Sequence, residues 1–240
     1  MMYSTEKNFS FFHVPKTAGG SMTVLLSKYS DKDNKNKIKN KNKHVKGWMT
    51  PYHVRSHTRG VFNHMHSFVD PHFYKWNCQK TFSFAFVRNP YDRVVSLKEF
   101  LPKHESKSFL QFCKILEKGD QDFPGRNLPE ELTPSFPPPH KDIRRKINRK
   151  DIQHTQFDCL SVNNTIPLNF VGRFENIKED FNYICEKIGV DEKYNSLGFE
   201  HSNREKNSKN YRDYYCAESK AIIDKVFDID FKTFNYEKEL

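Results

Sequence analysis

The stretch "FSFFHVPKTAGGSMTVLLSKY", residues 9–29, joins an apolar run to a helix-like segment through a pair of glycines. Residues 9–14 are nearly continuously apolar and end at Pro15, which is typical of a buried strand of a parallel sheet. The segment that begins at Gly19 has the composition of a helix. A strand, a glycine turn and a helix in this order form the arrangement in which a helix N-terminus binds a phosphate group.

The lysine of this stretch lies on the strand side of the glycines. A kinase-type P-loop carries its lysine directly after the last glycine, whereas Lys16 precedes Gly19 and Gly20. The stretch still offers the ammonium of Lys16, the hydroxyls of Thr17 and Ser21, and glycines that let the backbone approach an anion closely. Double glycines near a lysine also occur in plain turns, so the stretch alone leaves both interpretations open.

A second strand–helix pair follows. "TFSFAFV", residues 81–87, places phenylalanines on one face of a predicted strand and small residues on the other. In the next segment Asn89 is a good helix N-cap, Pro90 suits the first helical position and Asp92 favours the first turn. These signals predict a helix that starts directly after the strand.

The third pair consists of "LNFVGRF", residues 168–174, and a predicted helix over residues 175–189. Asn176 and Glu179 resemble a capping box at its start. Gly189 is a natural helix stop.

Strands that alternate with helices, with a last helix over 217–227, predict an α/β fold. We expect a P-loop-like three-layer fold with a central parallel sheet flanked by helices, as a single domain over residues 1–240. Ligands of such sheets bind beyond the carboxyl ends of the strands. A basic residue stands near each predicted strand end, namely Lys16, Arg88 and Arg173. Their convergence predicts an anionic ligand.

The formal net charge of +10 comes from two local segments. Residues 32–46 hold seven lysines and one aspartate and predict a mobile loop of low complexity. Residues 140–150 hold six basic residues and one aspartate, and the proline-rich residues 119–139 before them predict an irregular connection. Either basic segment could hold a polyanion, and charge alone does not separate nucleic acid from an acidic glycan.

The composition also bears on the compartment. No run approaches the ~18 apolar residues that span a bilayer, and the N-terminus has no signal-peptide pattern. The five cysteines are scattered without a C-x-x-C pair, which argues against a zinc site and a disulfide framework. The sequence therefore predicts a soluble, cytoplasmic protein. A removed membrane anchor would leave the same sequence, and the Golgi lumen is then the alternative.

Two motifs taken together resemble a known family. "PKTAGGS" is similar to the 5′-phosphosulfate loop of the sulfotransferases, and "FVRNPYDRVVS" is similar to their 3′-phosphate motif. The resemblance is closer to the carbohydrate branch, the Golgi-type membrane family that includes the heparan sulfate 2-O- and chondroitin sulfotransferases. "FVGRFENIKEDFNYIC" and the C-terminal tail also resemble this branch. The likeness spans most of the chain apart from residues 28–60 and 103–150.

The resemblance implies a donor, 3′-phosphoadenosine 5′-phosphosulfate, and a carbohydrate acceptor, with no metal and with nucleic acid disfavoured as a partner. Lys16 would neutralise the charge that develops on the bridging oxygen as the bond to sulfur breaks. Arg88 and Ser96 would hold the 3′-phosphate, which distinguishes this donor from ATP. The implied donor-binding residues are Lys16, Thr17, Ala18, Gly19, Gly20, Ser21, Met22, Arg88, Ser96 and Arg173.

The same resemblance implies a base for the acceptor hydroxyl in "FNHMHSFVDPHFY". Sulfotransferases of the heparan 2-O type carry an H-x-H-x-x-F stretch whose second histidine is the base, and here the spacing to phenylalanine is one residue shorter. The implied general base is His66, with His64 as a substrate-binding residue. A neutral imidazole suits proton abstraction near pH 7.

Two rival functions remain open. An ATP- or GTP-dependent phosphotransferase is disfavoured by the position of Lys16 and by the lack of a strand-terminal aspartate of the kind that holds Mg²⁺. A non-catalytic module could bind nucleic acid or acidic glycan through residues 32–46 and 140–150. For such a module, deletion of residues 32–46 would abolish binding, whereas His66→Ala would change nothing.

Overall fold

The computed structural model describes residues 2–30, 79–100, 106–118, 155–161, 163–192, 194 and 210–240. In these parts of the chain the strands are β1 (Met2–Ser4), β2 (Phe9–Phe12), β3 (Phe82–Val87) and β4 (Phe170–Arg173). The helices are α1 (Gly19–Leu26), α5 (Pro90–Phe100), α6 (Phe109–Lys118), α8 (Gln156–Leu160), α9 (Ile177–Ile188), α10 (Ala217–Val226) and α11 (Asp228–Thr233).

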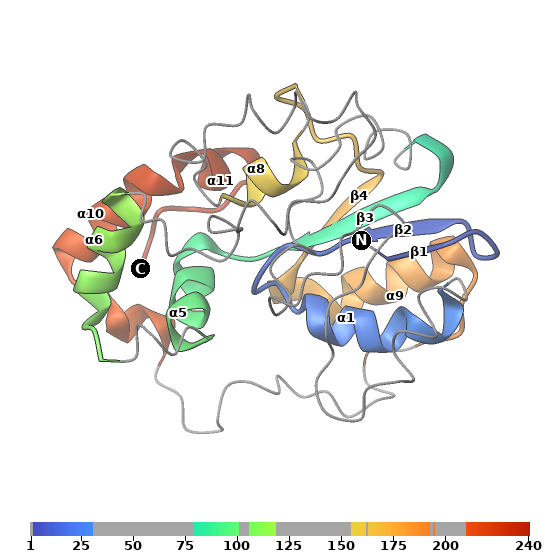
Figure 1. Ribbon diagram of the computed structural model, residues 1–240, viewed down its shortest axis with the longest axis horizontal. Helices are drawn as coiled ribbons and strands as arrows, with labels where there is room; N and C mark the ends of the chain where they lie inside the picture. Colours follow the sequence, from blue (N-terminus) through green and yellow to red (C-terminus); the bar gives the residue numbers. More distant parts are fainter. Residues whose placement is uncertain are drawn as a thin grey trace, which may run out of the picture.

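The strands form one sheet in the order β1-β2-β3-β4 (Figure 1). β2, β3 and β4 run parallel, with Phe11 opposite Phe84 and Phe84 opposite Phe170. They correspond to the three predicted strands, which confirms the predicted α/β class. β1 was not predicted, and it pairs with β2 in the antiparallel direction at one edge.

One face of the sheet packs against α1 and α9, which lie side by side below it in Figure 1. The side chains of a strand alternate between faces, so the phenylalanines of β2 and β3 that share this face come two residues apart. The buried cluster includes Phe9, Phe11, Phe84 and Phe86 from the sheet, Met22 and Leu25 from α1, and Phe181 and Ile184 from α9.

The opposite face packs against α8 and the residues that follow α11. The smaller side chains of β3, Ala85 and Val87, lie on this face, as predicted for residues 81–87, and β2 contributes Phe12. This cluster includes Phe12, Val14, Ala85, Val87, Cys159, Leu160 and Phe234. Helical layers on both faces of the sheet confirm the predicted three-layer arrangement.

A third buried cluster lies beyond the carboxyl ends of the strands, where α5 leaves β3 (Figure 1). The contributing elements are α5, α6, α10 and α11, and the cluster includes Tyr91, Val94, Phe112, Ile223 and Phe231. α6 was not predicted from the sequence. It packs against α5, the helix that follows Arg88 and carries the predicted site residue Ser96.

The helix ends test three local predictions. Asn89 accepts a hydrogen bond from the backbone N–H of Tyr91 at 2.9 Å, as expected of an N-cap. Gly189 is the C-cap of α9 with φ of 63°, also as expected. The capping box at Asn176 is wrong: its side chain accepts no cap hydrogen bond, because a 3₁₀ turn leads directly into α9 and leaves Asn176 without the extended backbone of a capping residue.

The predicted last helix over 217–227 corresponds to α10, whereas α11, which begins after Phe227, was not predicted. The predicted loop at 32–46, the irregular connection at 119–139 and the basic segment at 140–150 lie outside the described residues.

Candidate active site

Three parallel strands end at the same edge of the sheet, and the predicted basic residues follow them. Arg88 comes directly after β3, Arg173 ends β4, and Lys16 lies in the loop after β2. Nη1 of Arg88 donates a hydrogen bond to the backbone oxygen of Lys16 at 3.2 Å. The charges of Arg88 and Arg173 both act on Tyr236. The structure therefore gathers the three cations at the carboxyl edge, where ligands of parallel sheets bind.

The glycine loop, residues 14–20, has a constrained backbone. φ is 68° at Lys16 and 61° at Ala18, in the left-handed region that non-glycine residues seldom occupy. Thr17 between them is buried, and its Oγ1 donates to the backbone oxygen of Val14 at 3.0 Å. Ala18 is the N-cap of α1, and no side chain caps this helix. Such a backbone next to an uncapped helix start presents N–H groups to an anion.

The two glycines of the loop meet different surroundings. A Cβ on Gly19 would lie 1.7 Å from Cδ2 and 1.9 Å from Nε2 of His13, so the histidine ring fills the space of a side chain. Gly20 is exposed, and a Cβ there would meet nothing within 4 Å. Gly19 thus permits the packing of His13, whereas Gly20 leaves open space at the start of α1.

We expect Gly19→Ala to lower the free energy of unfolding by about 1–3 kcal/mol, the usual cost of overpacking. The added methyl group must displace the His13 ring, which stacks on Phe11 with ring centroids 6.1 Å apart. Gly20→Ala is the matched control and should not lower the free energy of unfolding. Thermal unfolding of both variants measures the difference, and equal melting temperatures would contradict the expectation.

Lys16 carries a perturbed charge. The pKa of its ammonium is lowered to about 8, mainly by burial and also by the positive charge of Arg88, whereas the charge of Glu99 opposes the shift. A partly buried cation next to a second cation is stabilised when an anion binds beside it. The electrostatics of the loop therefore favour an anionic ligand.

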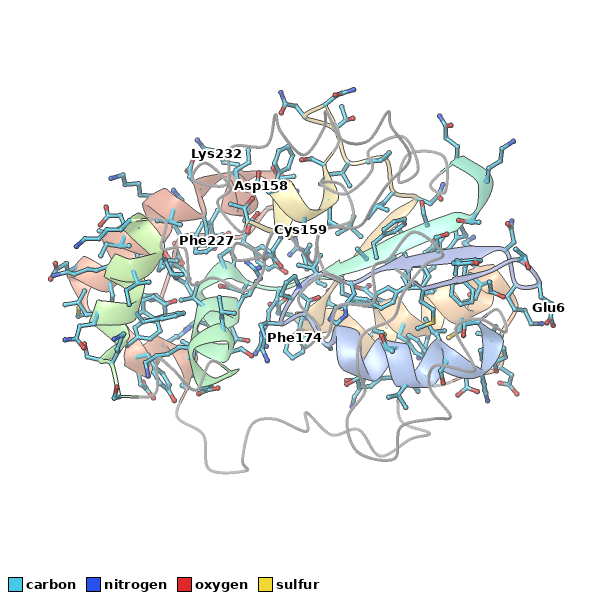
Figure 2. All side chains as sticks on the ribbon, viewed as in Figure 1. Glu6, Asp158, Cys159, Phe174, Phe227 and Lys232 are labelled. Carbon is cyan, nitrogen blue, oxygen red and sulfur yellow. The ribbon has the colours of Figure 1, made fainter. Side chains whose placement is uncertain are left out.

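Arg88 is buried and largely engaged by the protein. Its Nε donates to Oδ2 of Asp92 at 2.7 Å, and its Nη2 lies 2.7 Å from the same oxygen. Its Cζ lies 4.0 Å from the ring centroid of Phe174, which Figure 2 labels. A guanidinium has five N–H donors. Among the described residues, the contacts with Asp92 and with the Lys16 oxygen use three of these donors, which leaves two for a ligand.

The comparison with protein families decides the class of the protein. A family model described as "Sulfotransferase family" matches residues 1–237 of the chain. The chain belongs to the sulfotransferase family. It is therefore a transferase that moves a sulfuryl group. Searches of curated proteins and of solved structures found no match to the chain.

In this sulfotransferase Arg173 bonds the C-terminal segment. Its Nη2 donates to the backbone oxygens of Phe234 at 2.6 Å and Asn235 at 3.3 Å, and its Cζ lies 4.8 Å from the ring centroid of Tyr236. Phe234 is the C-cap of α11, so the arginine satisfies carbonyls at a helix C-terminus. The predicted contact of Arg173 with the nucleotide stays a prediction.

Ser96 is half-buried on α5, eight residues beyond Arg88. His64 and His66, the predicted substrate-binding residue and base, lie outside the described residues. Their roles therefore stay predictions.

Two polar residues that hydrogen-bond groups at the carboxyl edge of the sheet, Glu175 and Gln156, were not predicted from the sequence. Glu175 accepts from the backbone N–H of Asn89 at 2.7 Å and from the hydroxyl of Tyr236 at 2.8 Å. The Gln156 side chain bonds both the backbone N–H and the backbone oxygen of Arg88, each at 2.8 Å. These pairs lie 61 to 86 residues apart in the sequence, so no local pattern signals them.

The described ranges contain neither a candidate metal site nor a helix that could cross a membrane. There, no group of three or more His, Cys, Asp and Glu side chains could hold a metal ion. The helices of the same ranges lack the length and apolar character that crossing a bilayer requires. Four cysteines in these ranges carry free thiols, namely Cys113, Cys159, Cys185 and Cys216.

Proposed function

We propose that this sulfotransferase moves the sulfuryl group of 3′-phosphoadenosine 5′-phosphosulfate to a hydroxyl of a carbohydrate acceptor. The observation that carries the proposal is the glycine loop, in which the partly buried Lys16 stands beside an uncapped helix start. The lowered pKa of Lys16, about 8, indicates an ammonium whose charged form a bound anion would stabilise. The phosphosulfate end of the donor supplies that charge.

The residues present fit a donor with two separate anionic groups. The first turn of α1 and the open space at Gly20 suit the phosphosulfate. The two remaining N–H donors of Arg88 and the hydroxyl of Ser96, on the helix that follows, would hold the 3′-phosphate. Arg173 would add a contact to the nucleotide from the end of β4.

The proposed chemical step is in-line. The acceptor oxygen bonds to sulfur while the bond between sulfur and the bridging oxygen breaks, and adenosine 3′,5′-bisphosphate is released. His66 would take the proton of the acceptor hydroxyl as general base. The electron pair of the broken bond stays on the bridging oxygen, where the ammonium of Lys16 would neutralise the developing charge.

The carbohydrate acceptor is proposed from the motif resemblance, and the basic segments 32–46 and 140–150 favour an acidic glycan over a neutral one. His64 would contact this acceptor. Transfer of labelled sulfate to a panel of matched acidic and neutral glycans tests this choice. Equal turnover of both kinds would contradict the preference for acidic acceptors.

The donor is tested by ligand-induced stabilisation. We expect adenosine 3′,5′-bisphosphate at 100 times its dissociation constant to raise the free energy of unfolding by about 2.7 kcal/mol, as for any ligand that binds only the folded state. ADP lacks the 3′-phosphate and should stabilise far less at the same concentration. Thermal unfolding with each nucleotide measures the difference. Equal shifts for the two nucleotides would remove the case for a 3′-phosphate site.

A further inference from the structure

The glycine loop is held by side chains on its carbonyl side. Three successive backbone oxygens each accept a hydrogen bond: Val14 from the Thr17 hydroxyl at 3.0 Å, Pro15 from Nε of Arg93 at 3.1 Å, and Lys16 from Nη1 of Arg88 at 3.2 Å. Arg93 lies on α5, and Arg88 lies two residues before the start of this helix. The segment formed by Arg88 and α5 therefore holds two adjacent peptide groups of the loop.

These contacts set the direction of the peptide groups. The described peptide bonds are all trans, so the N–H of each peptide points opposite to its carbonyl. Because the carbonyls of Pro15 and Lys16 point to the arginines, the N–H groups of Lys16 and Thr17 point away from α5. The arginines also neutralise oxygens that would otherwise repel an anion.

The loop needs such support because its backbone is strained. Lys16 and Ala18 occupy the left-handed region although neither is glycine, and this costs free energy. Strained conformations of this kind persist only where surrounding contacts determine them. The arginine contacts adjoin the first of the two strained residues.

Arg93 differs from Arg88 in where it lies. It is 1% exposed, so it is remote from solvent and from a bound ligand. Its Cζ lies 5.9 Å from the ring centroid of Phe227, and the charge of Asp158 on α8 acts on it. Figure 2 labels Phe227 and Asp158. The fully buried Asp230 supplies the opposite charge.

Asp230 connects this arginine to the rest of the site. Its two carboxylate oxygens accept from the backbone N–H groups of Gln156 and Phe157, both at 2.8 Å. The Gln156 side chain in turn bonds the backbone of Arg88. Burial raises the pKa of Asp230 to about 6, and the charge of Arg93 opposes the rise, so the carboxylate is ionised at neutral pH. One buried polar network thus links α11 and α8 to the glycine loop.

We propose that Arg93 is a positioning residue of this sulfotransferase: through the Pro15 carbonyl it holds the glycine loop in its anion-binding conformation, with Asp230 as its charge partner. The inference rests on the proposed donor site for its effect on binding. The contact itself is independent of the donor.

The test compares Asp230→Asn with the double variant Arg93→Met/Asp230→Asn. The single variant keeps the arginine and its bond to the Pro15 oxygen, whereas the double variant loses that bond without leaving a buried charge unpaired. Amide hydrogen exchange of the peptide over residues 13–22 is measured without ligand. The dissociation constant for adenosine 3′,5′-bisphosphate is measured by calorimetry at a temperature where both variants are folded.

We expect faster exchange in the double variant, and an affinity for the bisphosphate lower by about 10-fold to 100-fold, the usual worth of a hydrogen bond to a charged group. The KM for the donor should rise while the KM for the acceptor stays at the value of the single variant. Arg93→Lys, which keeps the charge and a donor, should restore part of the affinity and serves as the test if the double variant does not fold.

The outcomes separate the two proposals. Equal amide hydrogen exchange of residues 13–22 in the single and double variants would overturn the role of Arg93. Measurable binding of the bisphosphate with the same affinity in both variants would also overturn it. If exchange rises but the wild-type protein does not bind the bisphosphate, the proposed donor fails while Arg93 keeps its role in holding the loop.

Discussion

Lys16→Met is expected to lower kcat by about a hundredfold to a thousandfold, the usual effect of removing one group that stabilises a developing negative charge. Methionine has a side chain of similar length and leaves the backbone of the loop unchanged. The decrease in kcat therefore measures the contribution of the ammonium group. Release of adenosine 3′,5′-bisphosphate measures the rate. A wild-type kcat in this variant would contradict the role of Lys16.

The pH profile supplies the control for this variant. Lys16 has a pKa of about 8, so its ammonium is present below pH 8 and is lost above it. The value of kcat/KM for the donor reports the free enzyme and should fall about tenfold per pH unit above this pKa. In the pH profile of kcat, the corresponding fall should begin at a higher pH than in kcat/KM, because the bound anion favours the charged lysine. In Lys16→Arg the side chain stays charged over this pH range, so kcat/KM should not fall above pH 8 in this variant.

His66→Ala is expected to lower kcat by about a hundredfold to ten-thousandfold, because general-base catalysis contributes that range. The matched control is His64→Ala, which removes a histidine from the same stretch and should mainly raise the KM for the acceptor. Binding of adenosine 3′,5′-bisphosphate should be unchanged in both variants, and calorimetry checks this.

The reverse pattern, with the larger loss of kcat in His64→Ala, would exchange the two assignments. Full activity in both variants would place the base elsewhere. A protein whose binding of acidic glycan survives in His66→Ala but is lost when residues 32–46 are deleted would instead be a non-catalytic module.

The three parallel strands and the helices α1, α5 and α9 could be predicted because each carries its own pattern. The phenylalanines of residues 81–87 alternate with small residues, and the structure buries the two sets on opposite faces of β3. The helix start at Asn89 and the stop at Gly189 depend on local backbone chemistry, and both were confirmed. Periodicity and capping act within a few residues, so sequence alone reveals them.

β1 and α8 were missed because they have no such local signal. α6 was missed although Phe109, Phe112, Cys113 and Leu116 follow helical spacing. β1 is three residues long and exists because β2 offers an unpaired edge. α8 is five residues long, and its first two backbone N–H groups are bound by Asp230, far away in the sequence. The capping box at Asn176 failed because the preceding turn, rather than the side chain, determines how α9 begins.

For the candidate site, the sequence by itself determined which chemical groups are available: a lysine before two glycines, and arginines at the ends of two predicted strands. Only the tertiary structure decided what those groups contact. It directs Arg88 and Arg93 to adjacent carbonyls of the glycine loop and turns Arg173 to the end of α11. The reason is physical: motifs record short-range backbone preferences, whereas a buried charge takes its partner from whichever distant segment the packed core brings beside it.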